Sequence, residues 1–117
     1  MPSFPFSQAL TANQLGFDPL TNWQLRTIPY QWARGAAVQL LARATDANTR
    51  ITVNSGTTTI QQRSPIQGGG TAGVTPSVLN TPPTTWIAGP GDIIQLAIDE
   101  VAGGTPTVDG IITVEPM

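Results

Sequence analysis

Alternating apolar and polar positions divide most of the chain beyond residue 26 into short strands. Residues 36–44 would place one apolar face on a strand with a period of two, and that face consists of Val38, Leu40, Ala42 and Ala44. Taken alone this segment is also compatible with a helix, but its length and its strand-like neighbours favour a strand. The same alternation predicts strands at residues 50–53, 57–63, 93–98 and 107–115.

Turn residues predict how several strands connect. Asn54-Ser55-Gly56 separates two β-branched runs, which is typical of a hairpin whose glycine takes a positive φ. Residues 93–98 and 107–115 are interpreted as a second hairpin with a longer, glycine-containing loop. Residues 27–32 predict a further short strand, which Pro29 places at a sheet edge or a strand start.

Residues 1–25 differ from the rest and are predicted to form an N-terminal arm. Pro2, Pro5 and Pro19 exclude a long helix, although one short helical turn is compatible with residues 7–15. The segment is nevertheless too apolar for a solvated tail. We therefore expect it to dock either on its own domain or on a neighbouring molecule.

Residues 64–83 are predicted to form a long loop rich in glycine and proline. The segment contains Gly68-Gly69-Gly70 and four prolines, with little alternation. A structureless loop of about 20 residues is uncommon in a compact domain and is usually functional or packed against something. Its apolar residues need cover, and they are Val74, Val78 and Leu79.

These elements predict an all-β fold. We expect a single antiparallel β-sandwich, jelly-roll-like, over residues 26–117, preceded by the extended arm of residues 1–25. A small closed barrel is the alternative. An immunoglobulin-type sandwich is also compatible, but its Cys–Trp–Cys signature is missing.

The composition argues against catalysis. The 117 residues include no lysine, histidine or cysteine, and these side chains carry most acid–base, nucleophilic and zinc chemistry. We therefore predict a non-enzyme with no catalytic residue, no metal site and no cofactor. Charged residues make up only 10% of the chain, which is typical of a surface that sits against other protein, although biased amino-acid usage would have the same effect.

Two apparent binding motifs have simpler interpretations. Residues 68–73 match G-x-G-x-x-G, but Pro76 blocks the helix that a dinucleotide site requires, so the glycines are interpreted as letting the loop lie flat on a surface. Asp99 and Glu100 point to opposite faces of a strand and do not converge. Asp109 approaches Asp99 only if their strands form a hairpin, where a calcium site is a minor alternative to solvated carboxylates.

Other partners are judged from charge and aromatic content. Five scattered arginines and a net charge of −2 provide no basic stripe, so no nucleic-acid partner is expected. No apolar run is long enough for a membrane helix, and no membrane partner is expected. The aromatic residues are expected in the core or at interfaces, with a sugar-stacking platform as the alternative: Trp23, Tyr30, Trp32 and Trp86.

Several segments resemble small virion proteins of bacteriophages and related viruses. The resemblance is carried by residues 61–66, 69–74, 76–80 and 88–92, and it extends over about the last two-thirds of the chain. It implies a structural component of a viral particle, a capsid decoration, cement, vertex or spike-base protein located in the virion. Its implied partners are other copies of the chain, as a homo-oligomer, and other capsid proteins.

The surfaces expected to make these contacts are the apolar parts of the arm and the loop. The candidate interface residues are Phe4, Phe6, Leu10, Phe17, Val74, Val78 and Leu79. The alternative function is a receptor- or carbohydrate-binding β module of a virion spike, whose partner would be a host receptor or glycan. That alternative predicts an exposed tryptophan in a concave polar pocket.

Overall fold

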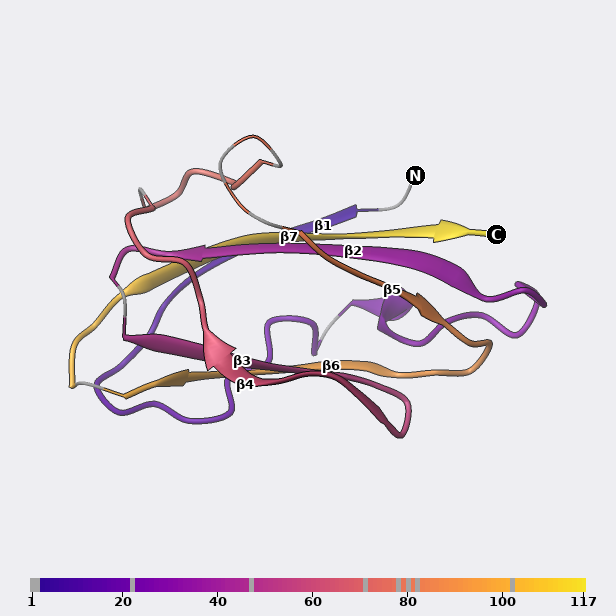
Figure 1. Ribbon diagram of the computed structural model, residues 1–117, viewed down its shortest axis with the longest axis horizontal. Coiled ribbons are helices and arrows are strands. Elements are labelled where there is room, and N and C mark those ends of the chain that lie inside the picture. The colour runs from indigo at the N-terminus through magenta and orange to yellow at the C-terminus, as the bar shows by residue number, and fades with distance from the viewer. Residues whose placement is uncertain are drawn as a thin grey trace.

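The fold is that of an antiparallel β-sandwich (Figure 1). The structure is a computed structural model that describes residues 3–21, 23–46, 48–70, 72–77, 79, 81, 83–101 and 103–117. Within these residues the chain forms a 3-10 helix, η1 (Gln24–Arg26), and seven strands: β1 (Ser3–Ala9), β2 (Ala36–Ala44), β3 (Thr49–Ser55), β4 (Thr58–Pro65), β5 (Thr84–Ala88), β6 (Ile94–Glu100) and β7 (Thr107–Pro116).

The strands form two separate sheets. One sheet has the order β1-β7-β2-β5 and the other has the order β4-β3-β6, and all pairings are antiparallel. The predicted all-β sandwich is therefore confirmed. Because the strands form two separate sheets, the alternative of a closed barrel is wrong. Five predicted strands are found as β2, β3, β4, β6 and β7.

The core lies between the sheets and follows the predicted alternation. In β2, Val38 and Leu40 are buried, and in β6 the buried positions alternate in the same way. Apolar side chains from both sheets fill the space between them, including Val53, Leu96, Ile98, Val108, Ile112 and Val114. Such burial stabilises by about 25 cal/mol for each Å² of apolar surface removed from water.

The predicted hairpins have different outcomes. The β3–β4 hairpin is confirmed, with Gly56 at φ 60° in its turn and two register shifts between its strands. The hairpin expected from residues 93–98 and 107–115 is wrong, because β6 belongs to the three-stranded sheet and β7 to the four-stranded sheet. Residues 27–32 do not form a strand; Thr27 makes only an isolated bridge to Ile93.

The expected arm is largely part of the sandwich. Residues Ser3–Ala9 form β1, an edge strand paired with β7 from Ser3↔Thr113 to Ala9↔Thr107, and no helical turn begins at Ser7. The next residues run along the free side of β6, where Phe17 and Ile98 exchange backbone hydrogen bonds. Leu10, Leu20 and Ile28 enter the core. Of the two expected docking places, the chain's own body receives this segment, because its apolar residues complete the sandwich.

Candidate functional site: an interaction surface

The loop between β4 and β5 lies over the outer face of the four-stranded sheet (Figure 1). Gly70 N–H donates to the Ala44 carbonyl at 2.9 Å, and Gly73 N–H donates to the Asp109 carboxylate at 3.2 Å. The Arg43 Nε donates to the Gly68 carbonyl at 3.3 Å. The first half of the loop is therefore held on β2 and β7 by specific hydrogen bonds.

The loop approaches β2 closely at Gly70. A Cβ atom on Gly70 would lie 3.0 Å from the Arg43 Cγ and 3.2 Å from the Ala44 carbonyl oxygen. The glycines thus let the loop lie flat, as the sequence predicted, but the surface beneath them belongs to the chain itself. Leu41, on the outer face of β2, is accordingly buried rather than solvent-exposed.

The second half of the loop presents apolar side chains to solvent. Val74 is 57% exposed and Leu79 is 94% exposed. Between them Pro76 is buried, and Thr81 N–H donates to the Ser77 carbonyl at 2.9 Å. Of the other predicted loop contact, Val78, nothing is concluded because it lies outside the described residues.

The N-terminal candidate residues are covered by their own domain. Leu10 is only 2% exposed, so it offers no surface to a partner, and its expected interface role is corrected. Phe4, Phe6 and Phe17 are partly buried against the core. The Phe4 ring stacks on Trp23 with a centroid separation of 5.4 Å. The structure therefore exposes Val74 and Leu79 of the loop, whereas the N-terminal candidates are buried or partly buried.

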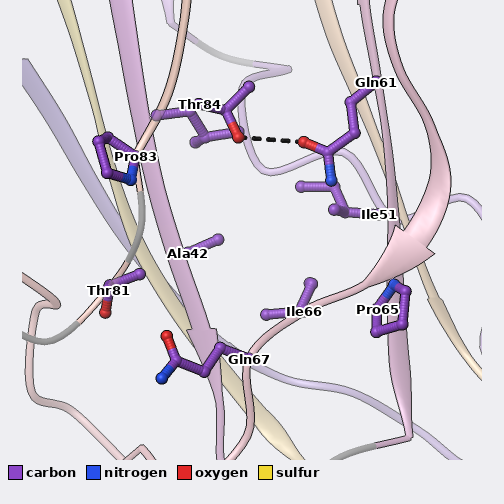
Figure 2. A pocket seen from close by; sticks show the side chains of 10 residues that line it. Ala42, Ile51, Gln61, Pro65, Ile66, Gln67, Thr81, Pro83 and Thr84 are labelled. Carbon is purple, nitrogen blue, oxygen red and sulfur yellow. Dashed lines mark hydrogen bonds between the residues drawn. The ribbon is translucent and has the colours of Figure 1, made fainter.

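A cavity of about 210 Å³ opens between β2, β4 and the start of β5 (Figure 2). Its apolar lining comes from Leu40, Ala42, Ile51 and Ile66. At one end Thr84 Oγ1 donates to Gln61 Oε1 at 3.0 Å, which links the two strands by their side chains. Every side chain assigned to its lining is uncharged, so the cavity suits a small neutral apolar group and has no acid or base to offer.

The carboxylates do not form the calcium site considered from the sequence. Asp99 accepts a hydrogen bond from Gly16 N–H at 2.7 Å and pairs with Arg63 at 2.9 Å. Asp109 lies in the other sheet, beneath the loop. Within the described residues, no group of three or more metal-binding side chains is placed to hold an ion.

Glu100 is an acid buried in the interior, which the sequence analysis did not predict. It is 1% exposed, and its Oε2 accepts hydrogen bonds from the Asn13 and Gly103 amides at 2.8 and 2.9 Å. Its position in phase with Ile94, Leu96 and Ile98 was the available signal. Because both bonds come from connecting segments, Glu100 acts as a tie between loops.

Two of the arginines form ion pairs within the chain. Arg26 pairs with Asp18 at 3.0 Å, and Arg63 pairs with Asp99. Surface pairs such as Arg63–Asp99, in which the arginine side chain is 53% exposed, typically contribute less than about 1 kcal/mol to stability. They do, however, neutralise charge that a contacting partner would otherwise have to desolvate.

The aromatic residues do not form the sugar platform that was considered as the alternative. Trp23, Trp32 and Trp86 are all partly buried and pack against the core. Tyr30 is 79% exposed, and its ring lies close to Gly91, where a Cβ would approach the tyrosine hydroxyl to 2.7 Å. The exposed aromatic surface is therefore a tyrosine rather than a tryptophan.

Comparison with known proteins adds no relative. No protein-family profile, curated protein or solved structure matches the chain. Among the described residues, no helix has the length and apolar character needed to cross a membrane.

Proposed function

We propose that this chain is a non-enzymatic structural component of a viral particle, of the capsid-decoration or vertex type. It would act by associating with copies of itself and with capsid proteins. The observation that carries the proposal is the glycine-rich loop, which exposes 94% of Leu79 and 57% of Val74 from a base fixed to the sheet. Covering these apolar side chains with another protein is favourable, by about 25 cal/mol for each Å² removed from water.

The anchoring distinguishes this loop from a solvated tail. Hydrogen bonds from Gly70 and Gly73 attach its first half to the sheet, and Thr81 near its end is buried and bonds back to Ser77 within the loop. Binding of a partner to this loop would therefore cost less conformational entropy than binding to a free segment, which would have to become ordered.

The charge distribution supports a lasting contact. Only 10% of residues are charged, and two of the five arginines are paired with aspartates inside the chain. Few charges need to be desolvated when another protein covers such a surface, whereas buried unpaired charges are costly.

The proposal is tested by locating the chain in particles. Virus-sized particles from cells that express it are separated on a density gradient, and the copy number of the chain is measured by quantitative mass spectrometry. We expect a fixed copy number per particle. A chain found only in the free-protein fractions would refute the proposal.

A matched pair of variants connects particle occupancy to the loop. Leu79→Ser removes the exposed apolar group of the loop, whereas Leu15→Ser changes a residue that is 70% exposed in the segment beside β6. We expect Leu79→Ser to lower occupancy at least tenfold and Leu15→Ser to leave it unchanged. Equal occupancy of both variants would exclude the loop as the contact.

Tyr30 supports a second candidate, a glycan-binding module. Its ring is 79% exposed beside a turn, which is an arrangement on which a sugar can stack. Binding of the purified protein to immobilised glycans, lost in Tyr30→Ala and kept in Leu79→Ser, would favour this candidate over assembly.

A further inference from the structure

The sheet edges of this protein differ in how they are protected. The three-stranded sheet ends at β4 and β6, and the four-stranded sheet ends at β1 and β5. The β6 edge is covered by the preceding chain, since Phe17 exchanges backbone hydrogen bonds with Ile98 and Gln14 accepts one from Glu100. Within the described ranges, no backbone hydrogen bond covers the outer edges of β1, β4 or β5.

Two of these three edges are unsuited to pairing. In β1, residues whose backbone groups bond to β7 alternate with residues whose backbone groups point away from the sheet. Leu10 N–H donates to the Pro106 carbonyl, so Phe4 and Phe6, which are in phase with Leu10, also bond to β7. Pro5 therefore faces outward, where its missing N–H interrupts the edge. In β4, two register shifts and the charged Arg63 have the same effect. Proline, bulges and charge are the usual means of protecting edges.

The backbone groups of β5 that face outward follow from the register of β2. Met117 directly follows β7, and its N–H donates to the Gly35 carbonyl. The backbone carbonyl of residue 35 therefore points toward β7. Because successive residues face opposite neighbours, even-numbered residues of β2 face β5. Ala44 agrees, since it exchanges hydrogen bonds with Gln67 and Gly70, which lie on the β5 side.

The even residues of β2 therefore bond to Thr84, Trp86 and Ala88, with which they are in register. Thr85 and Ile87 then direct their N–H and C=O groups away from the sheet. The strand carries no proline and no charged residue, and Ile87 is 65% exposed on its outer face. Beside it, Ala37, Thr113 and Glu115 contribute to a hollow of about 300 Å³.

We propose that β5 pairs with β5 of a second copy of this chain. Antiparallel pairing about a two-fold axis at Trp86 sets Thr85 opposite Ile87 of the second copy, and Ile87 opposite its Thr85. Both opposed pairs are then hydrogen-bonded pairs, so four new backbone hydrogen bonds satisfy every outward group of Thr85 and Ile87 in both copies. The two four-stranded sheets become one continuous eight-stranded sheet.

A second copy suits this edge better than an unrelated strand. The edge is self-complementary about Trp86, and its lack of charge means that identical strands do not repel. Pro83 before the strand and Pro90 after it limit pairing to the same short length in both copies. The inference deepens the proposed function, because it names the contact through which the assembly would associate with itself.

The test compares two proline substitutions at outward-facing edge positions. Thr85→Pro removes an N–H that does not bond to β2, and Ser7→Pro makes the matched change on β1. In sedimentation velocity over a range of concentrations, we expect the wild type and Ser7→Pro to approach twice the monomer mass of 12.3 kDa. We expect Thr85→Pro to remain a monomer. A wild type that stays monomeric, or a Thr85→Pro dimer as strong as the wild type, overturns the inference.

Amide hydrogen exchange of the unmodified protein keeps the inference testable if Thr85→Pro fails to fold. We expect the amides of Thr85 and Ile87 to exchange at least tenfold more slowly at a dimer-forming concentration than after dilution, with the Ser7 amide unchanged. Fast exchange at both concentrations overturns the inference. Particle occupancy is measured separately, so a monomeric chain that still occupies particles would refute the β5 contact and leave the proposed function standing.

Discussion

The packing of Phe6 over Gly110 provides a direct test of whether the N-terminal residues belong to the sandwich. Gly110 is paired with Phe6 in the sheet, and a Cβ on Gly110 would lie 2.3 Å from the Phe6 Cζ and 2.7 Å from the Leu41 carbonyl oxygen. Both separations are far below van der Waals contact. The Gly110→Ala substitution therefore forces the aromatic ring and the β2 backbone to move.

The expected cost follows from these contacts. Overpacking a well-packed site typically costs 1–3 kcal/mol, so we expect Gly110→Ala to destabilise by about 2 kcal/mol. Phe6 is half-buried, and Phe6→Ala should cost about 2 kcal/mol, roughly half of the value for a fully buried ring. In the double variant the ring is absent, so Gly110→Ala should cost at least about 1 kcal/mol less than it does alone.

Urea unfolding measures these changes. With an m-value of about 1.5 kcal/mol/M, a loss of 2 kcal/mol lowers the unfolding midpoint by roughly 1.3 M. Gly104→Ala is the matched control, because its Cβ would meet its nearest atom at 3.5 Å, an ordinary contact. That substitution should be neutral or stabilise by up to about 1 kcal/mol.

The coupling between Gly110→Ala and Phe6→Ala decides whether β1 packs on the sheet. If residues 3–9 were an arm that leaves the body, Phe6 would not contact Gly110, and the two substitutions would add to within about 0.5 kcal/mol. Additive costs, or a Gly110→Ala midpoint equal to that of Gly104→Ala, would refute the position of β1.

Two further predictions concern the acids that tie loops to the sheets. Glu100→Gln should cost about 1–3 kcal/mol because a neutral amide oxygen accepts the buried Asn13 and Gly103 N–H bonds more weakly than a charged carboxylate oxygen does. The exposed Glu115→Gln should change the unfolding midpoint little, and equal midpoints of the two variants would contradict the role of Glu100. Asp109→Asn should weaken the hydrogen bond from Gly73 and increase protease cleavage within the loop several-fold at unchanged secondary structure, and an unchanged cleavage rate would show that this bond does not hold the loop.

The strands that the sequence revealed are those that alternate between core and solvent. β2, β6 and β7 each bury one face, so their period of two is visible in the residues. β1 also alternates, with Phe4 and Phe6 on the inner side, but its prolines favoured an arm. An edge strand tolerates an outward-facing proline, and the sequence alone does not identify which strand is at an edge.

Other features depend on contacts between distant segments. β5 has five residues after a proline-rich loop, too few for a clear periodic signal. The assignment of β6 and β7 to different sheets is decided by the core they share, since neighbouring strands in sequence pair often but not always. The burial of Glu100 likewise requires the Asn13 amide, which lies 87 residues away.

The two proposals are connected by which apolar residues are buried and which are exposed. The N-terminal segment was expected to dock either on its own domain or on a neighbour, and its apolar residues are covered by the sandwich, so they do not support association. Other apolar side chains remain exposed, and among them Leu79 on the loop and Ile87 on β5 lie on distinct elements. A protein that decorates a lattice needs one contact with its own copies and another with the lattice. The edge of β5 suits the first because it is self-complementary, and the loop suits the second because its projecting side chains can enter a differently shaped surface. Thr85→Pro and Leu79→Ser should therefore have separable effects: the first on the mass in solution and the second on the number of copies bound to a particle.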